Sequence, residues 1–255
     1  MSRVLYKYLP PERNTYFSNG LLRFTPPSGL NDPYEGLPGI SEDLLEKVFS
    51  IAKLPFHPVP KDLQVLEKDP DLFIEPFLRD GMAKIDSALG ILSLSRRWDN
   101  PLMWSHYTES HQGFCVGYDT SHSYFVIDEN RKTVNGMTLL PVEYSDSRFM
   151  LMPQKMTRED TFASLCTKST DWRYEKEERL IAALNLATKT ISAEPYDVAL
   201  FNVPHEAISE IIIGLRSTEK IEGQARDLAL NLSVPLYKTY ISRNSFVLER
   251  KLLNG

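Results

Sequence analysis

Proline is concentrated in the first third of the chain, and no other sequence feature restricts the fold of a segment so strongly. Of the 17 prolines in 255 residues, 11 fall within the first 76. Proline interrupts helices and cannot donate a hydrogen bond to a sheet ladder. We therefore expect short elements joined by long loops in this third, and ordered loops of that kind often form binding sites.

Regular patterns of apolar residues cover most of the remaining chain. Alternation or short apolar runs predict strands over 4–8, 21–24, 90–95, 113–119, 138–144, 172–184, 210–214, 236–241 and 246–251. Helical spacing or a helix-start signal predicts helices over 41–54, 71–89, 101–110, 157–168 and 219–232. The strands form clusters instead of alternating regularly with helices. This order predicts an α+β fold with a central, mostly antiparallel sheet and helices packed around it.

No repeat, low-complexity tract or linker composition marks a boundary, so we expect a single domain over 1–255, with a helical insertion at about 41–88. The chain has 29 basic and 34 acidic side chains, and this acidic balance argues against non-specific binding to duplex nucleic acid. Cys115 and Cys166 lack a C-x-x-C spacing, which argues against a zinc ribbon or a redox dithiol. Together with the absence of a signal peptide or an apolar run of membrane-spanning length, this predicts a cytoplasmic protein that does not enter the membrane.

The densest polar stretch is WRYEKEERLIAAL, at 172–184. On a strand, Glu175, Glu177 and Arg179 would share one face, because alternate side chains point the same way. Two carboxylates beside a guanidinium could bind a ribose diol, a metal ion or a cationic leaving group. The alternative is a solvated strand with alternating charges.

A second group of polar residues surrounds the predicted helix at 101–110. Ser93 and Ser95 flank Leu94, so their side chains share a face at the end of an apolar strand. His106 could act as an acid or base, or could simply pack. Cys115 has no basic neighbour in the sequence, which predicts a buried apolar role for this side chain.

Two shorter motifs lie in the proline-rich third. In GLNDPYEG, at 29–36, Asp32 and Glu35 offer carboxylates in a loop. The alternative is a turn in which the Asn31 and Asp32 side chains cap their own backbone. In LYKYLP, Tyr6 and Tyr8 share one strand face, with Lys7 on the other. Their rings could stack on a planar ligand or pack in the interior. The signatures of P-loop, Rossmann, zincin and α/β-hydrolase proteins are absent.

LYKY, NDPYE, MWSHY with a following HQG, and WRYEKEER occur in an order that resembles a bacterial domain-of-unknown-function family. The resemblance extends from about residue 5 to residue 214. It favours a role such as a toxin or a phage-defence effector.

The chain also resembles the ADP-ribosyltransferases, whose split sheet presents an Arg or His, then Ser-x-Ser or Tyr, then Glu-x-Glu on three successive strands. Here the corresponding segments are Tyr6-Lys7, Ser93-Leu94-Ser95 and Glu175-Lys176-Glu177. The first segment departs from the pattern, because LYKY contains neither Arg nor His.

This second resemblance implies NAD as a substrate and no tightly bound metal. Glu177 would hold the ribose and stabilise the positive charge of the ribosyl centre, and Glu175 would orient or deprotonate the acceptor. Ser93 and Ser95 would support Glu177 and the ribose. The NAD-binding set would comprise Tyr6, Lys7, Tyr8, Asn31, Asp32, His106, Tyr107 and Arg179.

Two other functions remain open from the residues. One is a Mg²⁺-dependent nuclease or hydrolase that uses Asp32, Glu35, Glu175 and Glu177. The other is a non-catalytic module whose recognition surface combines Trp98, Trp104 and the NDPYE loop. The sequence identifies neither the acceptor, which could be protein, nucleic acid or a small molecule, nor the oligomeric state.

Overall fold

The computed structural model describes residues 3–52, 71–127, 133, 136–151 and 157–253. The chain forms two compact units. The first unit comprises Met1–Thr25, Gly90–Val142 and Asp171–Gly255, and the second comprises Pro26–Leu89 and Glu143–Thr170. The prediction of a single domain stays a prediction. The helices within the expected insertion at about 41–88 belong to the second unit.

An eight-stranded sheet forms the first unit. Its order is β15 (Leu248–Leu252), β14 (Leu236–Ile241), β13 (Ile208–Ile213), β5 (Phe114–Asp119), β1 (Val4–Leu9), β4 (Leu89–Ser95), β10 (Glu177–Ala183) and β6 (Thr138–Pro141). The pairs β1–β4, β1–β5, β5–β13, β6–β10 and β14–β15 are antiparallel, and β13–β14 is parallel. The predicted α+β class with a mostly antiparallel sheet is confirmed.

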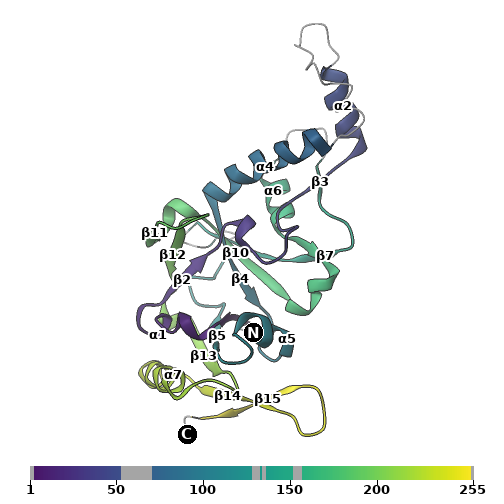
Figure 1. Cartoon of the computed structure of the whole chain (residues 1–255). Coiled ribbons are helices and arrows are strands. Elements are labelled where there is room, and N and C mark those ends of the chain that lie inside the picture. Colours follow the sequence, from purple (N-terminus) through teal and green to yellow (C-terminus); the bar gives the residue numbers. More distant parts are fainter. Residues whose placement is uncertain (1–2, 53–70, 128–132, 134–135, 152–156, 254–255) are drawn as a thin grey trace. The chain divides into compact units, whose positions relative to one another are not determined.

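A smaller antiparallel sheet and three helices complete this unit. The sheet contains β11 (Lys189–Ile191), β12 (Val198–Asn202) and β2 (Leu21–Phe24). The helices are α1 (Tyr16–Asn19), α5 (Pro101–Tyr107) and α7 (Glu219–Leu232), and the 3₁₀ turns are η1 (Pro11–Arg13), η4 (Leu184–Leu186) and η5 (His205–Ala207). Helix α7 packs along β13 and β14, as Figure 1 shows, and Thr218 caps its start.

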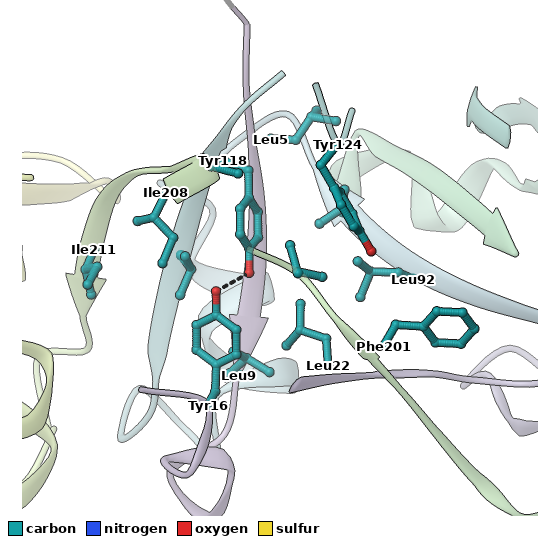
Figure 2. Close-up of a cluster of buried hydrophobic side chains, with 14 of the residues drawn as sticks. Leu5, Leu9, Tyr16, Leu22, Leu92, Tyr118, Tyr124, Phe201, Ile208 and Ile211 are labelled. Carbon is teal, nitrogen blue, oxygen red and sulfur yellow. Dashed lines mark hydrogen bonds between the residues drawn. The ribbon is translucent and has the colours of Figure 1, made fainter. Parts of the chain in front are cut away.

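Alternation along the central strands divides the buried side chains between two hydrophobic clusters. Leu5 and Leu9 of β1 join the larger cluster, in which the hydroxyl oxygens of Tyr16 and Tyr118 lie 2.6 Å apart (Figure 2). The intervening Tyr6 and Tyr8 join the smaller cluster, together with Cys115 and Trp104. Cys115 is fully buried and burial raises the pKa of its thiol well above the usual range, so the predicted apolar role is confirmed.

The second unit combines helices with short strands. Its helices are α2 (Glu42–Ala52), α4 (Asp71–Ala88) and α6 (Arg158–Leu165), with η2 (Pro27–Gly29). Two parallel strand pairs join β3 (Gly39–Ile40) to β8 (Met150–Leu151) and β7 (Glu143–Ser145) to β9 (Thr167–Ser169). Thr157 and Asp160 form the capping box that the sequence predicts at the start of α6.

Four predicted elements need correction. The helix predicted over 157–168 ends at Leu165, and Thr167 and Lys168 belong to strand β9. The strand predicted over 172–184 is wrong in its first part, because η3 (Thr170–Glu175) precedes β10 and Lys176 adopts a left-handed φ of 48°. The stretch 138–144 forms β6 and β7, which belong to different sheets. The helix predicted over 101–110 ends at Tyr107, because residues 109–111 all have positive φ. Residues 53–54 of the predicted helix over 41–54 lie outside the described residues.

Candidate functional site

The three strands that carry the predicted catalytic segments are consecutive neighbours in the large sheet, in the order β1, β4 and β10. Strand β1 pairs with β5 over six residue pairs, from Val4↔Asp119 to Leu9↔Phe114. On its other side, β1 pairs with β4 at Tyr6↔Ser95. The Lys7 ammonium donates a hydrogen bond to the Ser93 carbonyl, with Nζ and O 3.1 Å apart. The charged Lys7 side chain thus joins β1 to β4 next to the Tyr6↔Ser95 pair.

Lys7 experiences opposing electrostatic effects. Burial lowers the pKa of this ammonium to about 8, while the negative charges of Glu177 and Glu175 act in the opposite direction. The Arg13 guanidinium adds to the lowering. Lys7 thus lies within the electrostatic reach of both predicted catalytic carboxylates.

Glu177 and Arg179 form a buried ion pair at the start of β10. Arg179 Nε lies 3.0 Å from Glu177 Oε1, and Arg179 Nη2 lies 3.1 Å from Oε2. The two residues are 4 % and 1 % exposed. Such a bidentate pair fixes the plane of the carboxylate, so the geometry makes Arg179 a positioning residue for Glu177.

Glu175 lies in η3 instead of on the strand, which corrects the expectation that it shares a strand face with Glu177. The left-handed Lys176 interrupts the alternation between the two carboxylates. Ser95 Oγ donates to the Glu175 carbonyl at 2.6 Å and accepts from the Arg97 N–H at 3.0 Å. Ser95 therefore secures the turn that carries Glu175.

Tyr107 and Glu175 connect the end of α5 to this turn. The Tyr107 hydroxyl donates to Glu175 Oε1, with the oxygens 2.5 Å apart, and Glu175 is 3 % exposed. Asn100 caps α5 and also donates to the Tyr174 carbonyl at 2.9 Å. Exposed His106 places Nδ1 3.1 Å from the Tyr174 hydroxyl. Helix α5 and the 174–176 turn are thus held together by three side-chain hydrogen bonds.

Tyr6 and Tyr8 are buried, as expected if their rings pack in the interior. The Tyr6 hydroxyl donates to Glu210 Oε1 at 2.9 Å, and the Tyr8 hydroxyl donates to the Arg97 carbonyl at 2.8 Å. The Tyr8 ring meets Trp104 edge to face. Trp104 is fully buried, so its expected place on a recognition surface is wrong.

Asn31 and Asp32 belong to the second unit. Asn31 is exposed, whereas Asp32 is buried and its Oδ1 accepts the Tyr34 N–H at 2.9 Å. This hydrogen bond closes a local turn, as expected if the Asp32 side chain caps its own backbone. Nearby, Glu35 Oε1 pairs with Lys168 Nζ at 3.1 Å, and both residues are buried.

Arg250 is a prominent charged residue that the sequence analysis missed. Its guanidinium carbon lies 4.6 Å from the Trp98 ring centre and 4.1 Å from that of Tyr237, and its Nη1 is 2.6 Å from Glu210 Oε1. The partners are far apart in the chain. No local pattern could have identified this cluster.

Among the described residues, no group of three or more His, Cys, Asp or Glu side chains is placed to hold a metal ion. Within the same part of the chain, no helix is long and apolar enough to cross a membrane. The described side chains around Glu177 comprise two buried carboxylates, an ammonium, a guanidinium and a phenol. Carboxylates in such a set can accept sugar hydroxyls and stabilise positive charge.

Residues 103–180 match a family described as a protein of unknown function, DUF2971. The match confirms the expected resemblance to a domain-of-unknown-function family. It contains residues 103–107 of α5, among them Tyr107, and also Glu175 and Glu177. No curated protein and no solved structure matches the chain.

Proposed function

We propose that this chain, whose residues 103–180 carry the DUF2971 match, is an NAD-dependent ADP-ribosyltransferase-like enzyme. The bond between nicotinamide and C1′ of the ribose breaks, and its electron pair leaves with nicotinamide. An acceptor nucleophile then bonds to C1′, and its proton passes to a base. The acceptor is a protein, a nucleic acid or a small molecule, and the enzyme works in the cytoplasm as a toxin or phage-defence effector.

One observation carries the proposal: Glu175 at the end of η3 and Glu177 at the start of β10 are both buried, and both act electrostatically on Lys7 of β1. The resemblance to ADP-ribosyltransferases requires its three segments to lie side by side. The adjacency of β1, β4 and β10 supports the proposal, because about 80 residues of chain separate each of these strands from the next.

Glu177 is proposed to stabilise the transition state. Loss of nicotinamide leaves positive charge at C1′ and the ring oxygen, and a fixed carboxylate lowers the energy of that charge. Arg179 holds the carboxylate by its two oxygens at 3.0 and 3.1 Å. Carboxylate oxygens are acceptors that suit the hydroxyls of a ribose.

Glu175 is proposed to take the proton of the acceptor. A positioned base of this kind contributes on the order of 10²–10⁴-fold to the rate. Tyr107 donates to its side chain, and Ser95 holds its backbone. Both contacts orient the carboxylate before the acceptor arrives.

Lys7 is proposed to bind an anionic oxygen of NAD in place of the Arg or His of the ADP-ribosyltransferases. An ammonium is a compact point charge that can pair with a phosphate oxygen. Its hydrogen bond to the Ser93 carbonyl orients it between β1 and β4.

Nicotinamide release from NAD by the purified chain tests the proposal. Glu177→Gln should lower release by about 10²–10³-fold, because it removes the charge that opposes the cationic centre. Glu178→Gln is the matched control. Glu178 is equally buried on the same strand, but its partners are Arg3 and Arg96. It should retain release at a comparable melting temperature.

The release assay is run with and without chelator and with each class of acceptor. Unchanged release in Glu177→Gln would contradict the proposal, as would absence of NAD binding and release in the wild type under all acceptor conditions. Release abolished by chelator would favour the metal-dependent alternative instead.

A further inference from the structure

We propose that the second unit holds a separate binding pocket for a neutral polyhydroxylated molecule of monosaccharide size. The pocket has a volume of about 330 Å³, at the small end of the range for ligand pockets. Its lining includes five serine and threonine side chains together with Asp32, Tyr34, Asp146, Arg148, Phe149 and Lys168. The inference does not depend on the proposed activity, because every lining residue belongs to the second unit.

Asp32 is the side chain that most directly indicates a ligand. It is 4 % exposed, and its Oδ1 accepts the Tyr34 N–H. Both residues line the pocket. A largely buried carboxylate is stabilised by each hydrogen-bond donor that it gains, so a hydroxyl group of a ligand would stabilise Asp32.

The charges of the lining favour a neutral ligand over an ionic one. The lining holds two carboxylates, Asp32 and Asp146, and two cations, Arg148 and Lys168. Glu35, beside the pocket, pairs with Lys168 at 3.1 Å, so neither sign of charge is in large excess. A hydroxyl group both donates and accepts. It can therefore donate to Asp32 and accept from a lining ammonium or hydroxyl.

Aromatic rings and a fixed guanidinium complete the pocket. Tyr34 is 61 % exposed, and the Arg148 guanidinium carbon lies 5.7 Å from its ring centre. Arg148 also donates to the carbonyls of Leu37 and Pro38 at 3.1 and 2.8 Å, which secures this wall before a ligand arrives. The rings of Tyr34 and Phe149 can cover the apolar C–H face of a sugar.

This pocket would explain the NDPYE motif, for which the proposed catalytic site gives no role. Asp32 and Tyr34 line the pocket, and Glu35 pairs with its Lys168. The motif would contribute an acceptor, a ring and the counter-ion of a buried lysine to one site.

Ligand-observed NMR on the full chain tests this inference with D-glucose, D-ribose and myo-inositol as probes. Inorganic phosphate and putrescine serve as anionic and cationic comparisons. We expect saturable binding of at least one polyol and weaker binding of both ions. Asp32→Asn should weaken polyol binding by about tenfold or more, because it replaces an anionic acceptor.

Asp43→Asn is the matched control, since Asp43 is exposed in the first turn of α2 within the same unit. It should bind as the wild type does. Tyr34→Ser removes an exposed ring without opening a core and should also weaken binding. The inference is overturned if no polyol binds, if phosphate or putrescine binds better, or if Asp32→Asn and Tyr34→Ser both bind polyol as tightly as the control. Glu177→Gln should leave polyol binding unchanged, which separates this test from that of the proposed activity.

Discussion

At the scale of single residues, Lys7 shows how burial and neighbouring charge compete. Burial disfavours the ammonium form, and Glu177 and Glu175 favour it. Because burial is the larger effect, the pKa falls from 10.5 to about 8. Lys7 can therefore lose its charge within a pH range in which the chain can be studied.

Lys7 should make the free energy of unfolding and the binding of NAD change in opposite directions with pH. Between about pH 8 and 10.5 the unfolded chain holds more protons on Lys7 than the folded chain does, so the stability contribution rises with pH. Below pH 8 the ammonium is charged in both states and its burial penalty is complete. NAD affinity should instead fall above about pH 8, because the positive charge is lost. Denaturant titrations and calorimetry from pH 7 to 10 measure both.

The matched variants for this prediction are Lys7→Met and Lys7→Arg. Lys7→Met should remove the additional rise in stability, measured as a difference from the wild type. Lys7→Arg should keep NAD affinity above pH 8, because a guanidinium stays protonated. Identical pH profiles for the wild type and Lys7→Met would contradict the assignment.

At the scale of elements, the functional geometry depends on how strands begin. β10 starts only after η3 and the left-handed Lys176, and this turn separates Glu175 from Glu177. β5 starts beside the end of β1, where Gly113 allows the backbones of the two strands to approach closely.

Lys176→Val should lower the free energy of unfolding by about 1–3 kcal/mol, because a β-branched residue is strained at positive φ. It should also reduce nicotinamide release by misplacing Glu175. Lys176→Asn removes the same charge but tolerates the left-handed region. Denaturant unfolding and the release assay compare the two, and equal losses in both variants would show that charge matters instead of conformation.

Gly113→Ala and Gly81→Ala should change stability in opposite directions. A Cβ at Gly113 would collide with the Leu9 carbonyl oxygen and lie 3.0 Å from Pro10 Cα, so the strands would have to separate. A Cβ at Gly81, inside α4, meets nothing within 4 Å. Alanine there should raise the free energy of unfolding by about 0.5–1 kcal/mol. Thermal melts of both variants test these two predictions. A lower melting temperature for Gly81→Ala would contradict the prediction for Gly81.

At the scale of the whole molecule, the chain forms two compact units, each assembled from segments distant in sequence. The first unit is built on the eight-stranded sheet and its hydrophobic clusters. The second contains the buried ion pair of Glu35 and Lys168, which joins the NDPYE loop to β9. Loss of this ion pair should therefore destabilise the second unit first.

Lys168→Met should destabilise the second unit by about 3–5 kcal/mol, because it removes a buried cation that pairs with the buried Glu35 carboxylate. Amide hydrogen exchange should accelerate over 26–40 and 143–151 before it accelerates in β1 and β5. Adding Glu35→Gln should recover part of the loss by removing the buried negative charge with which Lys168 pairs. Uniform acceleration over both units would argue that they unfold together.

The sequence by itself determined the local elements wherever a short-range pattern decides the conformation. Alternation of side chains identified β1, β2 and β14, and periodicity with a Thr cap identified α7. The Thr157–Asp160 capping box marked α6 for the same reason, because both partners lie within one turn.

Only the tertiary structure decided which of these elements meet. The adjacency of β1, β4 and β10, the place of Arg250 between Trp98 and Tyr237, and the Glu35–Lys168 pair all join residues far apart in the chain. The pKa of Lys7 likewise depends on burial and on charges from other elements. Such contacts arise from packing of the whole chain, and neighbouring residues in sequence do not encode them.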